Sequence, residues 1–234
     1  MPERVLLLDN TLHPRLFILA KRWSRLLGSA YVDVVHAPTM RVLPDLTAYT
    51  HLVVAGSEAS ILQWAPWMER EAEAVREGAA LGLRMLGSCF GHQMLVASLS
   101  GVQYLRRSPH PEVGWIAVEI IGEDELLLGV PNPWTVFSFH LDEVAAPPPS
   151  PWRILARSGD CPTQILRFGD APVWGIQAHP EISRRAAEVA TRSYLLLARR
   201  RGGAPRRPLR RPAAGDQAFL TLVDRFLGDG ARSG

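Results

Sequence analysis

One cysteine lies between two glycines in the stretch Leu-Arg-Met-Leu-Gly-Ser-Cys-Phe-Gly-His-Gln, residues 83–93. The apolar run before Gly87 is typical of a buried strand, and residues 92–99 have the spacing of a helix. Small residues two positions to either side of Cys89 allow a sharp strand-to-helix turn, which presents the side chain at the edge of a sheet. The positive end of the helix dipole at that point favours thiolate over thiol. Cys89 is therefore a candidate nucleophile.

A histidine and a carboxylate follow a second apolar run, Val-Trp-Gly-Ile-Gln-Ala at residues 173–178. Pro180 disfavours helix at His179, so the chain is expected to be extended there. Side chains two residues apart then project to the same side, which lets Glu181 orient the imidazole and stabilise its charged form. An imidazole can take the thiol proton and later return one. Cys89, His179 and Glu181 together form a candidate catalytic triad.

Both motifs are similar to those of the class I glutamine amidotransferases. The Gly-x-Cys-x-Gly-x-Gln elbow of that family reads Gly-Ser-Cys-Phe-Gly-His-Gln at residues 87–93, and its His-Pro-Glu motif matches residues 179–181. The resemblance implies hydrolysis of the γ-amide of glutamine to glutamate and ammonia through a γ-glutamyl thioester. It also implies a synthetase subunit that receives the ammonia, whose identity the sequence does not reveal.

The same resemblance implies where an oxyanion and a substrate would be held. The glycine-rich loop that follows the third strand in the family is Gly56-Ser57-Glu58 here. The backbone N–H groups of Ser57 and Phe90 are the expected oxyanion donors. The expected substrate-binding residues are Gly56, Gln93, Phe139 and His140.

Residues 136–144 resemble the His-x-Asp-Glu-Val stretch of stand-alone amidotransferase-like proteins and of γ-glutamyl peptidases. Two interpretations of His140 stay open: it lines the substrate pocket together with Phe139, or it pairs with Asp142 to stabilise a turn. The loop at Gly56 lacks the proline that many amidotransferases have there, which we interpret as a mark of the stand-alone branch. The closest alternative function is accordingly a γ-glutamyl peptidase or hydrolase acting on larger γ-glutamyl conjugates.

The composition predicts one domain spanning residues 1–234, because 234 residues with 47% hydrophobic content suffice for one sizeable core. The first apolar run has four residues, too few for a secretory signal, and no run approaches the roughly 20 residues that cross a bilayer. We therefore expect a cytoplasmic protein without membrane contact, with Cys89 and Cys161 as reduced thiols. No zinc-type spacing and no glycine-rich nucleotide loop is present, so neither a metal nor a cofactor is expected.

The net charge of +3 is unevenly distributed. Residues 199–211 contain seven arginines and no acidic residue, which leaves 19 basic against 23 acidic residues elsewhere. Proline and glycine interrupt this stretch, so residues 199–215 are predicted to be a solvated loop before a C-terminal helix. Because clustered arginines neutralise phosphate, the alternative is a catalytically silent regulatory module that binds nucleic acid or an acidic partner.

The order of apolar runs and helical patterns predicts an α/β fold, a three-layer sandwich with a central mixed, mostly parallel sheet. The resemblance makes this the flavodoxin-like fold of the family. Expected strands lie at residues 4–8, 31–35, 51–55, 84–86, 115–121, 135–139, 153–156, 163–168 and 173–178, and expected helices at residues 14–27, 67–80, 92–99, 182–197 and 217–227. Ligands of such sheets bind at the carboxyl ends of the strands, where both the Ser57 loop and Cys89 fall.

Overall fold

The computed structural model describes residues 3–14, 18–200 and 215–228. Its centre is a nine-stranded sheet with the order β2-β1-β3-β4-β9-β8-β7-β5-β6. Seven strands run in one direction, and β5 and β8 run the opposite way, so the expected mixed sheet is confirmed. The strands are β1 (Arg4–Asp9), β2 (Tyr31–His36), β3 (His51–Val54), β4 (Arg84–Ser88), β5 (Leu105–Ile120), β6 (Trp134–Val144), β7 (Trp152–Arg157), β8 (Ile165–Phe168) and β9 (Val173–Ile176).

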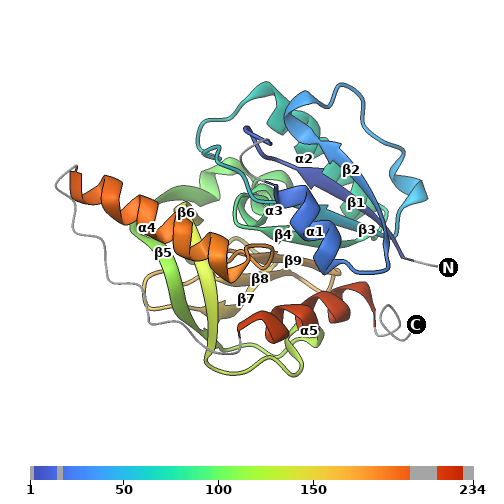
Figure 1. The fold of residues 1–234 in the computed structure, drawn as a ribbon. Helices are drawn as coiled ribbons and strands as arrows, with labels where there is room; N and C mark the ends of the chain where they lie inside the picture. Colours follow the sequence, from blue (N-terminus) through green and yellow to red (C-terminus); the bar gives the residue numbers. More distant parts are fainter. Residues whose placement is uncertain (1–2, 15–17, 201–214, 229–234) are drawn as a thin grey trace.

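Helices cover both faces of this sheet (Figure 1). Alternate residues of β1 and β3 enter two separate hydrophobic clusters, as the two-residue period of a strand requires. One cluster is closed by α1 (Leu19–Leu26) and α5 (Gly215–Leu227), and the other by α2 (Pro66–Ala80) and α3 (Phe90–Ser100). The remaining α-helix of the described residues, α4 (Arg184–Arg200), follows the His-Pro-Glu motif in the chain and lies against β5. The expected three-layer sandwich is therefore confirmed.

Strand β5 is the largest departure from the expected elements, since it begins ten residues before the predicted strand at 115–121. It forms a long antiparallel hairpin with β6, and the pairing shifts register between Arg107 and Glu112. Pro109 and Pro111 lie inside that shift. Proline cannot donate a ladder hydrogen bond, so the sequence pattern placed the beginning of this strand too late in the chain.

Two predicted helices begin later than expected. Helix α1 begins at Leu19 rather than at residue 14, and α4 begins at Arg184 rather than at residue 182. Residues 180–181 form a turn and residues 182–183 are irregular, which leaves the His-Pro-Glu motif outside regular structure. Most of the arginine-rich stretch, residues 201–214, lies outside the described residues.

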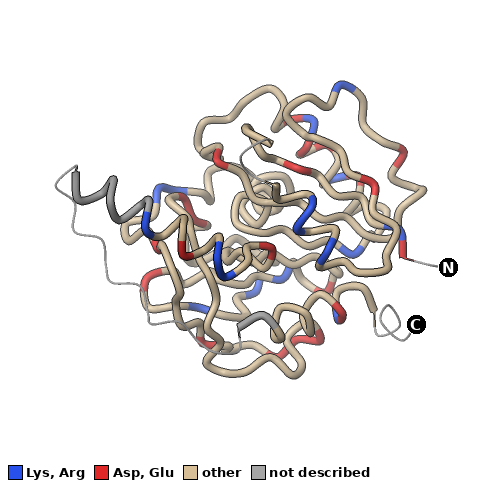
Figure 2. The backbone as a smooth tube through the Cα atoms, viewed as in Figure 1, with Lys and Arg blue, Asp and Glu red and all other residues tan. Residues whose placement is uncertain are grey.

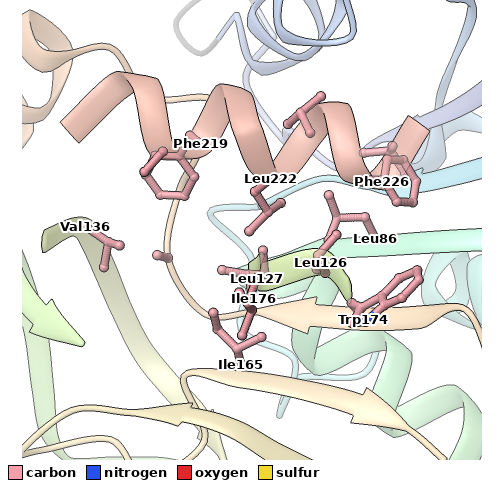
Figure 3. Packing of buried hydrophobic residues seen from close by; sticks show 14 of the residues in the cluster. Leu86, Leu126, Leu127, Val136, Ile165, Trp174, Ile176, Phe219, Leu222 and Phe226 are labelled. Atoms are coloured by element: carbon pink, nitrogen blue, oxygen red, sulfur yellow. The ribbon is translucent and has the colours of Figure 1, made fainter. Parts of the chain in front are cut away.

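Helix α5 packs its apolar side against the sheet (Figure 3). The stripe consists of Phe219, Leu222, Val223 and Phe226, all of which are buried. Figure 3 shows Leu222 and Phe226 directed at Leu86 of β4 and at β9. The end of the helix is held by Arg84, whose Nε donates to the Phe226 carbonyl at 2.8 Å. The C-terminal helix therefore belongs to the core that supports β4, the strand preceding Cys89.

Charged residues of both signs are interspersed along the described backbone (Figure 2). Among the described helices, none combines the length and the hydropathy that crossing a membrane requires.

Truncating Leu222 tests how much α5 contributes to the fold. Leu222 is completely buried, so Leu222→Ala should lower the free energy of unfolding by about 2–5 kcal/mol through lost burial and a residual cavity. Urea denaturation followed by circular dichroism measures this change. Gln217→Ala on the exposed side of the same helix is the matched control and should change stability by less than about 0.5 kcal/mol. Equal effects of the two substitutions would contradict the docking of α5.

Candidate active site

The backbone of Cys89 has the geometry of a nucleophile elbow. Its φ is 50° and its ψ −107°, and no other non-glycine residue in the described ranges has a positive φ. The Cys89 N–H donates to the Ile176 carbonyl at 2.8 Å, which ties the turn to β9. A Cβ atom on Gly91 would overlap the Val54 carbonyl, and one on Gly87 would overlap the Gly91 carbonyl. Both glycines are therefore required by close backbone contacts, as the sequence predicted.

His179 lies next to this elbow with both ring nitrogens in contact with acceptors. Its Nδ1 is 2.8 Å from Oε1 of Glu181, and its Nε2 is 3.3 Å from the Phe139 carbonyl oxygen. That same carbonyl oxygen is 3.5 Å from Cys89 Sγ. The His179 N–H donates to the Phe137 carbonyl at 2.9 Å, which fixes the backbone of the motif on β6. A doubly protonated imidazole would therefore have an acceptor for each N–H.

Electrostatics favour the charged form of this imidazole. Burial by itself would lower the pKa of His179, but the negative charges of Cys89 and Glu181 and hydrogen bonds to both raise it well above the ordinary value. A histidine that stays protonated next to a cysteine stabilises the thiolate, which is the nucleophilic form. The arrangement can therefore support a thiolate–imidazolium pair.

The loop after β3 lies against the histidine. A Cβ atom at Gly56 would approach His179 Cε1 to 3.1 Å and Glu181 Oε1 to 3.6 Å, so glycine allows the closest packing there. The Ser57 hydroxyl donates to the Asn10 carbonyl at 2.6 Å and accepts from the Ala59 N–H at 3.0 Å. These bonds fix the backbone on either side of the expected oxyanion donor.

Phe90, the other expected oxyanion donor, is the first residue of α3. The first N–H groups of a helix have no acceptor within the helix. Its position directly after Cys89 therefore leaves an N–H group at the positive end of the helix dipole, next to the sulfur.

Gln93 and His140 turn toward the protein interior. The Gln93 amide nitrogen donates to the Asp142 carbonyl at 2.7 Å and to Oε1 of Gln177 at 3.3 Å. His140 Nδ1 contacts the Asp142 carbonyl at 3.1 Å, so the Asp142 partner considered for His140 is its backbone rather than its carboxylate. Both side chains therefore contact the backbone of Asp142 near the end of β6. Phe139, by contrast, contacts Cys89 and His179 through its backbone carbonyl.

The sequence profile of the family described as glutamine amidotransferase class-I matches residues 23–192. This chain belongs to the class I glutamine amidotransferase family. The A subunit of the glutamine-hydrolyzing GMP synthase of Pyrococcus abyssi is 29% identical over 146 residues, which are 61% of this chain and 76% of that protein. Its counterpart in Saccharolobus solfataricus is 31% identical over 150 residues, 64% of this chain and 77% of that protein. These similarities support glutamine amidotransferase activity in general.

Solved structures of the family show the same fold. A glutamine amidotransferase from Thermotoga maritima superposes with a TM-score of 0.74 at 20% identity, covering 97% of this chain and 99% of that one. One from Methylobacillus flagellatus gives a TM-score of 0.72 at 19% identity, covering 96% and 93% of the two chains. The amidotransferase fold therefore extends over nearly the whole of this chain.

A buried polar cluster lies behind β6 of this amidotransferase. Glu112 accepts hydrogen bonds from His140 Nε2 at 3.0 Å, from the Ser158 hydroxyl at 2.5 Å and from the Gln164 amide at 2.5 Å. Ligand atoms of Glu112, His140 and Cys161 lie within 4.8 Å of one another, close enough to share a metal ion. Burial, reinforced by the Glu112 charge, raises the pKa of the Cys161 thiol to about 12. Glu112 thus accepts three hydrogen bonds and lies at the centre of a buried network.

Two other buried polar residues lie close to the site. His92, three residues after Cys89, is fully buried, and burial followed by the nearby His140 lowers its pKa to about 3. Its ring packs on Gly175, where a Cβ atom would overlap Nδ1. Asn10, which contacts the loop at Gly56, was missed. The signal available was its place directly after the first strand, at the carboxyl edge where ligands bind.

Replacing Gly91 tests the elbow. Gly91→Ala should shift the turn at Cys89 and destabilise the amidotransferase by about 3 kcal/mol or more, because backbone atoms of Val54 cannot move aside easily. Thermal unfolding and the rate of Cys89 alkylation by iodoacetamide, located by peptide mass spectrometry, report both effects. Gly159→Ala is the control, since a Cβ atom there meets nothing within 4 Å. A Gly91→Ala protein with normal stability and normal alkylation would show that the elbow tolerates a side chain.

Proposed function

We propose that this protein hydrolyses the γ-amide of glutamine through Cys89, His179 and Glu181. The observation that carries the proposal is the shared contact of Cys89 Sγ and His179 Nε2 with one carbonyl oxygen, that of Phe139. Two atoms within 3.5 Å of one oxygen are close enough to act on the same substrate atom, which supports the proposed pair. The raised pKa of His179 supports an imidazolium that can act as an acid.

In the first half of the reaction the Cys89 thiolate attacks the side-chain carbonyl carbon of glutamine. The carbonyl oxygen becomes negatively charged, and the N–H groups of Ser57 and Phe90 stabilise that charge. Collapse of the tetrahedral intermediate breaks the bond between carbon and nitrogen. His179 gives its Nε2 proton to the departing nitrogen, so ammonia leaves and a γ-glutamyl thioester remains on Cys89.

In the second half a water molecule attacks the thioester. His179 is now neutral and takes a proton from the water, while the same two N–H groups stabilise the second oxyanion. Breaking the bond between carbon and sulfur releases glutamate and restores the thiolate and the imidazolium. Glu181 keeps Nδ1 protonated throughout, which leaves Nε2 as the nitrogen that exchanges protons. Gly56 and the Phe139 backbone are the proposed substrate contacts.

The names of the relatives support glutamine as the substrate and point to a synthetase on a separate chain, because each relative is called one subunit of a glutamine-hydrolyzing GMP synthase. Both cysteines are free thiols, and reduced thiols are typical of cytoplasmic proteins, which supports a cytoplasmic location. The γ-glutamyl peptidase alternative keeps the same steps and differs only in the size of the leaving group.

Substrate class is tested by measuring ammonia release from glutamine beside cleavage of γ-glutamyl dipeptides. We expect glutamine to be preferred, because a site closed around a free amide rejects a bulky leaving group. Intact mass spectrometry after treatment with a glutamine chloroketone should show one adduct on wild type and on Cys161→Ala, and none on Cys89→Ala. Faster cleavage of dipeptides would favour the peptidase, and labelling of Cys89→Ala would remove Cys89 from the proposed mechanism.

Neutralising Glu181 tests its role in the triad. Glu181→Gln should reduce kcat/KM for glutamine by about 100-fold or more, since the amide no longer stabilises the imidazolium. The loss of the Glu181 charge also lowers the pKa of His179, so the alkaline limb of the pH profile should move to lower pH. The exposed Glu123→Gln variant is the control. An unchanged alkaline limb in Glu181→Gln would contradict the electrostatic role.

A further inference from the structure

The pairing of β5 with β6 is interrupted close to the candidate active site. Between the pairs Glu112–His140 and Arg107–Asp142, four residues of β5 lie opposite one residue of β6. Two of these four are prolines, which have no N–H group to donate. Backbone pairing alone therefore holds residues 140–142 less firmly than an unbroken ladder would.

The Glu112 side chain supplies a second connection between the two strands at this point. Its Oε2 lies 3.0 Å from His140 Nε2, and the other ring nitrogen, Nδ1, lies 3.1 Å from the Asp142 carbonyl oxygen. Both side chains are buried, and hydrogen bonds are stronger away from water. The imidazole therefore joins β5 to the end of β6 through contacts at both of its nitrogens.

Glu112 is itself held from the segment between β7 and β8. The Ser158 hydroxyl donates to its Oε1 and the Gln164 amide donates to its Oε2, each at 2.5 Å. Ser158 directly follows β7 and Gln164 directly precedes β8, so neither donor belongs to the β5–β6 hairpin. Since each carboxylate oxygen has a donor, Glu112 is a fixed support for the His140 ring.

Phe139 lies directly before His140 on β6. Its carbonyl oxygen is the atom that contacts both Cys89 Sγ and His179 Nε2. This carbonyl group and the His140 N–H belong to one planar peptide unit, so the two residues cannot move independently at that bond. A displacement of His140 would therefore move the acceptor that His179 Nε2 faces.

We propose that Glu112 is a positioning residue for His179, acting through His140 on the Phe139 carbonyl group. This inference rests on the proposed function, in which His179 Nε2 gives its proton to the departing nitrogen of glutamine. An acid catalyst must lie within hydrogen-bond reach of the atom that it protonates. The Phe139 carbonyl holds the Nε2 side of the ring next to Cys89, and Glu112 holds that carbonyl in place.

Two substrates separate this role from general disruption of the fold. Glu112→Gln keeps the shape of the side chain but removes its charge and one acceptor, so kcat/KM for glutamine should fall about tenfold. The γ-methyl thioester of glutamate releases a thiolate that needs no proton, so its kcat/KM should fall less than about twofold. A smaller fraction of folded enzyme would lower both values equally. Equal losses, or an unchanged kcat/KM for glutamine, would overturn the inference.

A double-mutant cycle tests whether Glu112 acts through His140. His140→Asn keeps an N–H group for the Asp142 carbonyl but cannot reach Glu112, so it should lower the glutamine-to-thioester ratio of kcat/KM about as much as Glu112→Gln does. The two together should lower the ratio no further, whereas additive losses would contradict the proposed route. The exposed Glu119→Gln variant on the same strand is the matched control and should keep the wild-type ratio.

NMR follows the Phe139 carbonyl whether or not glutamine is the substrate. Residues 139–140 are the only Phe-His pair in the sequence, so carbonyl-13C phenylalanine and 15N histidine give one correlated signal. Cys89→Ala should move this carbonyl resonance in the otherwise wild-type protein and should not move it in Glu112→Gln. Equal movement in both backgrounds would overturn the inference. If the expected difference appears but wild type releases no ammonia from glutamine, the proposed function alone fails.

Discussion

The positive φ of Cys89 is the constraint on which the rest of the site depends. A non-glycine residue in this region costs about 1–3 kcal/mol and persists only where the surroundings leave no alternative. Here the close contact between Gly91 and the Val54 carbonyl fixes where α3 begins against β3. The backbone of Cys89 must therefore turn sharply between β4 and α3. The hydrogen bond from Cys89 to Ile176 adds a second fixed point on β9. The sulfur is therefore placed by backbone packing and not by its own side-chain contacts.

The strands that follow α3 bring the other two residues of the candidate site to Cys89. Strand β9 pairs with β4, so a residue three positions beyond the end of β9 emerges beside the turn that follows β4. This is why His179 reaches Cys89 although 90 positions separate them in the sequence. The β5–β6 hairpin then brings the Phe139 carbonyl to the same point, and the bond from His179 to the Phe137 carbonyl fixes the two segments together.

The sequence could predict the elements whose signals are local. The glycines around Cys89 were recognised from their spacing, although the tightest contact of Gly91 is with Val54, 37 positions away. The proline of the His-Pro-Glu motif argued against helix at His179, as the structure has it, but the turn at residues 180–181 was not predicted. The stripe of α5 was predicted correctly, since helical spacing is a local property. The length of β5 was not predicted, because pairing with β6 overrides two prolines that locally argue against a strand.

Side chains with distant partners could not be assigned in this way. The Gln93 amide donates to the Asp142 carbonyl, 49 residues away, and no local pattern predicts that contact. Asn10 meets Ala55 across 45 residues, and no spacing rule relates two such positions. Glu71 did carry a local signal, an acid on the apolar face of a helix between Met68 and Val75, but its meaning depends on which residue it faces.

Two buried acids near the same loop illustrate how surroundings set chemical roles. Glu181 lies against His179, and its charge and hydrogen bond help to raise the pKa of that imidazole. Glu71 is fully buried in α2, and burial raises its pKa to about 8 although a hydrogen bond with the Asn10 side chain lowers it in part. Gly56 packs on the His179–Glu181 pair, and Asn10 holds the residues on either side of Gly56 through hydrogen bonds with Ala55 and Ser57. The loop therefore faces ionisable side chains at its centre and is held at both ends by neutral hydrogen bonds, which do not change when a proton moves.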